Sequence, residues 1–92
     1  MVRVSNGCAR FRFYRPQAGY VCLAGDFNGW QLGELHMKRG PLGWWTGTLC
    51  LPPGTYRFRY EADGEWFTDY ASYGIEYGPF GPDGVVRVAA VP

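Results

Sequence analysis

The 92-residue sequence contains little of what metal sites, membrane spans and nucleic-acid surfaces require. It has one histidine, His36, and three cysteines without C-x-x-C spacing, whereas a structural zinc site needs about four closely spaced ligands. No stretch approaches the roughly 20 apolar residues that cross a bilayer, and residues 1–11 lack the apolar segment of a signal peptide. The net charge of +1 offers no electrostatic case for nucleic acid or an anionic membrane. We therefore expect a cytoplasmic protein with no metal, no cofactor and no nucleic-acid or membrane partner.

The cysteines Cys8, Cys22 and Cys50 are an odd set. Their simplest interpretation is three small apolar side chains in a reducing compartment. The sequence leaves open the alternative of a disulfide between Cys8 and Cys22, which requires that the strands carrying them are neighbours.

What the sequence does contain is a series of short strands, and no 10-residue stretch has helical periodicity. In residues 56–61 aromatic and charged side chains alternate, which predicts a strand with Arg57, Arg59 and Glu61 facing outward. Asp63-Gly64 predicts a hairpin turn after it. Residues 69–84 show no period and are expected to form a long loop. The other expected strands are 9–13, 20–24, 35–39 (short), 44–51, 65–68 and 85–91.

This pattern predicts one all-β domain over residues 1–92, an antiparallel β-sandwich of immunoglobulin-like type with about seven strands. A five-stranded barrel is the alternative fold.

The four tryptophans are not equivalent. Trp45 shares a strand face with leucines and is expected in the core, with Trp44 on the opposite face. Trp30 and Trp66 each follow a glycine-containing turn, "FNGW" and "DGEW", where a large ring is expected to face solvent. The C–H face of a pyranose ring would suit such a ring, and Arg59 could bond its hydroxyls. Alternatively, either ring caps the end of the sandwich.

The stretches "VCLAGDFNGWQ" and "MKRGPLGWWTGTLCLPPGTYRFRYEADGEWFTDY" resemble family 48 carbohydrate-binding modules over roughly residues 8–90. The ordered motifs G-x-F-N-x-W, L-P-x-G, Y-[KR]-[FY] and D-G-x-W carry the resemblance. It implies the early-set sandwich found in front of glycogen branching enzymes and isoamylases, and in the glycogen-binding domain of the AMP-activated protein kinase β subunit.

The resemblance also implies roles for individual residues. Trp30 and Trp66 match the two tryptophans that stack on sugars, and Arg59 occupies the place of the basic glucan-binding residue. Phe80 is the nearest counterpart of an aliphatic residue that the glucan encircles, and Asp83 aligns loosely with an amide. Phe80 is bulkier than its counterpart and Asp83 lacks the amide's donor, so these two depart from the family pattern.

We therefore expect a non-catalytic module that binds an α-glucan such as glycogen, starch or a maltooligosaccharide. The alternative is an accessory module that docks onto a separately encoded glycogen enzyme or kinase subunit without binding sugar itself. Catalysis is not expected, because the acidic residues near Trp66 lie at turns or on a strand face where solvated charge is the ordinary explanation: Glu61, Asp63, Glu65 and Asp69. The aromatics of "YRFRY" fall on the presumed core face, which removes a stacking platform for nucleic acid.

Overall fold

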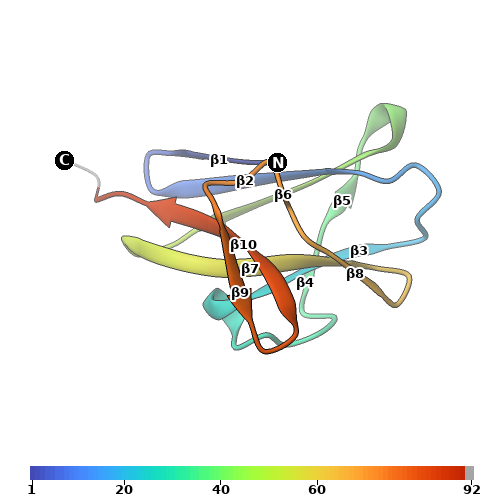
Figure 1. The fold of residues 1–92 in the computed structure, drawn as a ribbon. Coiled ribbons are helices and arrows are strands. Elements are labelled where there is room, and N and C mark those ends of the chain that lie inside the picture. Colours follow the sequence, from blue (N-terminus) through green and yellow to red (C-terminus); the bar gives the residue numbers. More distant parts are fainter. Residues whose placement is uncertain (91–92) are drawn as a thin grey trace.

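A computed structural model describes residues 1–90, which form ten strands in two antiparallel sheets (Figure 1). The four-stranded sheet runs in the order β1 (Val2–Ser5), β2 (Cys8–Tyr14), β6 (Trp44–Cys50) and β5 (Lys38–Arg39). The second sheet runs in the order β4 (Leu35–His36), β3 (Val21–Gly25), β7 (Gly54–Ala62), β10 (Gly81–Val88) and β9 (Ile75–Gly78), and β8 (Glu65–Phe67) also pairs with β7. Two short 3-10 turns, η1 (Asp26–Asn28) and η2 (Pro41–Gly43), complete the described chain. The predicted all-β sandwich is confirmed, and the barrel alternative is wrong.

The core lies between the sheets, as the alternation in β7 predicts. Phe58 and Tyr60 are fully buried and contact Phe11 and Phe13 from the opposite sheet. Burial of each such ring stabilises the fold by roughly 1.5–3 kcal/mol. Trp45 is also buried, as expected, and its indole N–H donates to the Arg15 carbonyl oxygen at 2.9 Å.

The expected short strand at residues 35–39 is divided between the two sheets. Leu35 and His36 pair with β3, whereas Lys38 and Arg39 pair with β6. Met37 between them is buried in the core, so this segment crosses from one sheet to the other at the edge of the sandwich. Strand β1 had no corresponding prediction.

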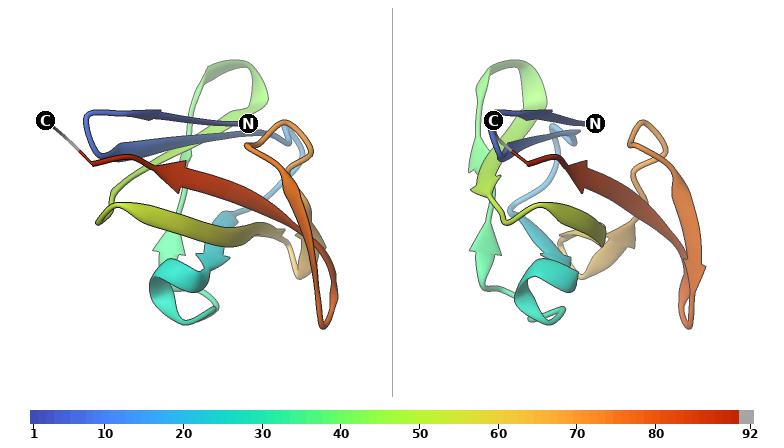
Figure 2. Two further views of the ribbon diagram at one scale, coloured as in Figure 1. Left: turned by 60° about the vertical axis from the view of Figure 1, so that its left-hand side comes forward. Right: turned by 90° about the vertical axis from the view of Figure 1, so that its left-hand side faces the viewer.

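The expected long loop at residues 69–84 is wrong in its second half. Ile75–Gly78 and Gly81–Val88 form a β-hairpin, β9–β10, which projects below the sandwich in Figure 1. Its last strand therefore begins earlier than the predicted 85–91 and ends at Val88, while residue 91 lies outside the described residues. Figure 2 shows that the η1 turn and the tip of this hairpin reach the same end of the molecule.

The interpretation of three reduced cysteines is also wrong. Cys8 and Cys50 lie opposite each other on β2 and β6 and form a disulfide, and Cys22 is buried with a free thiol. The pairing considered from the sequence, Cys8 with Cys22, would have joined strands of different sheets.

Two of the carboxylates interpreted as solvated are buried. Asp69 is 5% exposed and accepts the Tyr60 hydroxyl at 2.6 Å as well as the amino group of Met1. Burial, reinforced by Asp69, raises the pKa of Tyr60, so its hydroxyl stays a donor. Glu61 is on the outer face of β7 as predicted but is only 6% exposed, and its carboxylate is compensated by the Tyr20 hydroxyl at 2.6 Å and the Gly64 amide at 2.7 Å, from which it accepts.

Within residues 1–90, no helix is both long and apolar enough to cross a membrane. The same residues contain no cluster of three or more histidine, cysteine, aspartate or glutamate side chains that could hold a metal ion.

Candidate functional site

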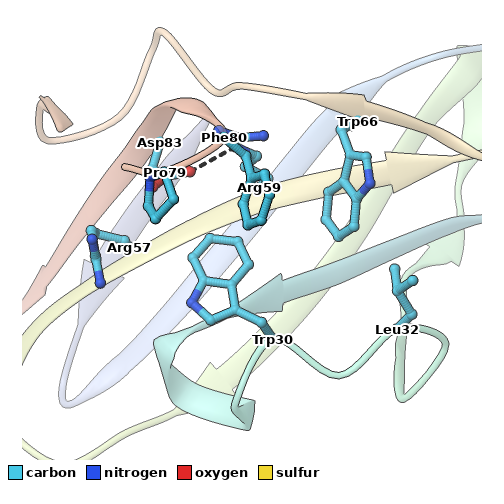
Figure 3. Close-up of a pocket in the computed structure, with 8 residues that line it drawn as sticks. All are labelled: Trp30, Leu32, Arg57, Arg59, Trp66, Pro79, Phe80 and Asp83. Atoms are coloured by element: carbon cyan, nitrogen blue, oxygen red, sulfur yellow. Dashed lines mark hydrogen bonds and ion pairs between the residues drawn. The ribbon is translucent and has the colours of Figure 1, made fainter. Parts of the chain in front are cut away.

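A groove of about 690 Å³ lies on the outer face of the second sheet, between the η1 turn and the β9–β10 hairpin (Figure 3). Its volume is within the range of small-molecule sites. The five residues singled out from the sequence, which come from distant parts of the chain, all line it. The complete lining is Trp30, Leu32, Arg57, Arg59, Trp66, Pro79, Phe80 and Asp83.

Trp30 reaches the groove through an unusual backbone. The Gly25 backbone packs so closely on β7 that an added Cβ would lie 2.5 Å from the Arg57 carbonyl oxygen. The chain then makes the η1 turn and leaves it with two consecutive left-handed residues, Gly29 at φ 63° and Trp30 at φ 59°. The glycine-containing turn predicted in "FNGW" therefore has its left-handed residues at Gly29 and Trp30 itself, whereas Asn28 does not have a positive φ. A left-handed tryptophan costs about 1–2 kcal/mol, and such strain concentrates at functional positions.

Asp26 holds the edge of the Trp30 ring. Its carboxylate accepts the Trp30 indole N–H at 3.0 Å, the Arg57 amide at 2.9 Å and the Arg57 guanidinium at 3.3 Å. Burial acts to raise the pKa of the Asp26 carboxyl, but the hydrogen bonds from Arg57 and Trp30 outweigh it and lower the pKa. The same ion pair raises the pKa of Arg57. The half-buried ring is thus held through its nitrogen at the lining of the groove.

Trp66 lies at the other end of the groove from Arg57 (Figure 3). It is on β8, next to the Asp63-Gly64 turn, in which both residues have a positive φ as a two-residue hairpin requires. Its side chain remains 42% exposed. Trp30 is half-buried, both indoles line the groove, and neither belongs to the hydrophobic core cluster.

Arg59 lines the same groove as the two indoles and is paired with Asp83. Its Nε donates to Asp83 Oδ1 at 2.6 Å, and the two side chains are only 12% and 7% exposed. This pairing follows from β10, which brings Asp83 beside β7. The sequence placed both residues near the site but did not reveal that they bind each other.

Phe80 is at the tip of the β9–β10 hairpin and is 89% exposed. A phenyl ring held in water over a groove has no packing role in the described fold. Pro79 beside it also lines the groove.

Comparison with known proteins shows the family of this chain. A family described as carbohydrate-binding module 48, the isoamylase N-terminal domain, matches residues 2–79. The chain belongs to this family. Among similar curated proteins are a 1,4-alpha-glucan branching enzyme of Salinibacter ruber, 32% identical over 71 residues, and a chloroplastic or amyloplastic 1,4-alpha-glucan-branching enzyme of Pisum sativum, 30% identical over 81 residues. The matches cover 75% and 78% of this chain but only 11% and 10% of those enzymes.

Several groove residues of this carbohydrate-binding module were missed from the sequence. Arg57 could have been found, because it shares the outward face of β7 with Arg59. Asp26, which does not line the groove but holds Trp30, was missed too: it lies inside the "GDFNGW" motif, but its role depends on a partner 31 residues away. Nothing in the local sequence marks Leu32 or Pro79.

Proposed function

We propose that this carbohydrate-binding module binds α-glucan chains in the groove, with Trp30 and Trp66 stacking on sugar rings. The observation that supports this most is the convergence on one groove of two indoles, Trp66 exposed and Trp30 half-buried, with the guanidinium groups of Arg57 and Arg59. Indole faces suit the C–H faces of glucose, and the guanidinium groups can donate to its hydroxyls. Phe80 and Asp83 complete the proposed contact set, Phe80 as a ring at the rim and Asp83 mainly by orienting Arg59.

The proposed role is non-catalytic. Hydrolysis of a glycosidic bond requires two carboxylates about 5–10 Å apart across a cleft. Among residues 1–90 the groove lining includes one carboxylate, Asp83, and it is engaged by Arg59.

An open site with two stacking rings should bind weakly, with Kd between about 10 μM and 1 mM. Maltoheptaose titrated to millimolar concentration, followed by tryptophan fluorescence and NMR shifts, tests this. Trp30→Ala should weaken binding by about 1–3 kcal/mol, by analogy with stacking on nucleobases, whereas Trp30→Tyr should retain measurable affinity. A wild-type chain whose Trp30 and Trp66 resonances do not move at millimolar sugar would refute the proposal.

Docking onto a glycogen enzyme or kinase subunit is the second candidate. It is favoured by exposed rings outside the groove, Tyr70 at 73% and Tyr77 at 83%. Absence of glucan affinity, together with capture of such a protein that Tyr77→Ser abolishes, would favour this function.

The cytoplasmic location stays a prediction. It was drawn from the absence of an apolar span and signal segment, whereas disulfides such as Cys8–Cys50 are rare in the cytosol.

A further inference from the structure

A second hollow of about 420 Å³ adjoins the groove. Leu32 and Trp66 line both spaces, so the two hollows meet at these side chains. Figure 3 shows both residues at the end of the groove away from Arg57. The second hollow is otherwise lined by Tyr20, Cys22, Gly33, His36, Glu61 and Gly64.

Strand register explains why these residues meet. Cys22 pairs with His36 on β4 and with Glu61 on β7, and Glu61 pairs in turn with Trp66 on β8. Residues paired across antiparallel strands share a face, so these four form one row across the outer face of the sheet. On β7, side chains two residues apart also share a face, which places Glu61 in line with the two arginines of the groove. The distance along β7 from Arg57 to Glu61 is about 14 Å at 3.4 Å per residue.

The polar groups of the second hollow are held in position. Glu61 Oε2 accepts the Tyr20 hydroxyl and the Gly64 amide, which orients the carboxylate and leaves Oε1 without a bond to another of residues 1–90. His36 Nδ1 lies 3.4 Å from Cys22 Sγ, so one nitrogen of this exposed imidazole is engaged and the ring orientation is set. The Tyr20 ring lies edge-on to His36, with centroids 6.4 Å apart.

We propose that the second hollow is an additional sugar subsite, which receives glucose units of the same chain beyond Trp66 and so makes the module select longer glucans. This proposal rests on the proposed glucan binding. A carboxylate with a free oxygen accepts hydrogen bonds from sugar hydroxyls, and imidazole can donate or accept at its second nitrogen. Tyr20 and Trp66 supply ring surface on either side of these groups. In the groove, the hydrogen-bond donors are mainly the arginine side chains. In the second hollow, the main hydrogen-bond acceptor is the Glu61 carboxylate, so successive sugars would meet different partners.

The test compares maltotriose with maltoheptaose on the wild type, Glu61→Gln and His36→Ala by calorimetric or NMR titration. Glu61→Gln is close in shape and retains an oxygen that can accept from Tyr20 and Gly64, but it replaces the free carboxylate oxygen with an amide donor. Each change should weaken the affinity for maltoheptaose by about 3- to 10-fold, as loss of a hydrogen bond predicts. The affinity for maltotriose should stay within about 2-fold of the wild-type value. Glu34→Gln, an exposed acid outside both hollows, is the matched control and should change neither.

The outcomes separate the two proposals. A wild-type chain that binds neither sugar would overturn both. Binding that neither Glu61→Gln nor His36→Ala affects, or equal or larger losses with maltotriose, would overturn the second subsite alone. His36→Ala keeps the test decisive if Glu61→Gln reduces folding, which thermal unfolding of each variant would reveal.

Discussion

The Asp26 carboxylate should stabilise the fold through its charge, and Asp26→Asn isolates that contribution. The carboxylate bridges η1 to β7 through Arg57 and holds the indole of Trp30. Asparagine keeps one oxygen acceptor but loses the charge that strengthens all three bonds. Since the Asp26 and Arg57 side chains are 32% and 40% exposed, solvent screens part of the interaction. We expect a loss of about 1–2 kcal/mol at pH 7, or a fall in Tm of roughly 5–15 °C for a domain of this size.

The direction of the Asp26 pKa shift determines how its contribution to stability depends on pH. The pKa of Asp26 is lowered in the folded state, so the carboxylate stabilises the fold above its unfolded pKa of about 3.9. That contribution disappears as the pH falls through the lowered pKa. The stability difference between wild type and Asp26→Asn should therefore be full at pH 6–7 and small near pH 2.

Urea denaturation of both proteins at several pH values measures this difference. Glu34→Gln removes one negative charge from an exposed loop and should change stability by less than about 0.5 kcal/mol. A stability loss in Asp26→Asn that is equally large at pH 7 and pH 2 would refute the reasoning, because it would not depend on the carboxylate charge.

Three further predictions concern the core, the buried ion pair and the disulfide. Phe58→Ala should cost about 3–5 kcal/mol and Trp66→Ala less than about 1 kcal/mol in chemical denaturation, and equal losses would place Trp66 in the core. Arg59→Ala should cost about 3 kcal/mol because Asp83 stays buried without its cation, and a second change, Asp83→Asn, should recover part of that loss; a double variant no more stable than Arg59→Ala would contradict the pairing. Reducing the Cys8–Cys50 disulfide, whose residues are 42 positions apart, should lower stability by up to about 4 kcal/mol, and an unchanged Tm in reductant would show that the bond does not constrain the chain.

The parts of the fold that could be predicted are those in which neighbouring residues carry the information. In β7, aromatic and charged residues alternate because one face meets the core and the other meets the groove. The Asp63-Gly64 turn is likewise local, since two left-handed residues join β7 to β8. Once these are placed, the outward positions of Arg59 and Trp66 follow without knowledge of the rest of the molecule.

The β9–β10 hairpin could not be predicted because β9 has no buried face. Glu76 and Tyr77 are both exposed although they lie on opposite sides of the strand, so no alternation of apolar and polar residues marks it. Backbone pairing with β10 supplies its hydrogen bonds instead. The pairing of Arg59 with Asp83 depends on this hairpin, so it could not be predicted from the sequence either.

The position of Trp30 shows how local and distant information combine at the groove. The local motif predicts a ring that faces solvent after a turn, whereas in the structure the ring lines the open groove and is half-buried. The ring's orientation, however, depends on Asp26, whose other partner is Arg57 on a distant strand. Those bonds offset the strain of a left-handed tryptophan and hold the ring before any ligand arrives. Because a ring that is already ordered loses less entropy on binding, Asp26→Ala should weaken glucan binding even though it removes no atom of the proposed contact surface.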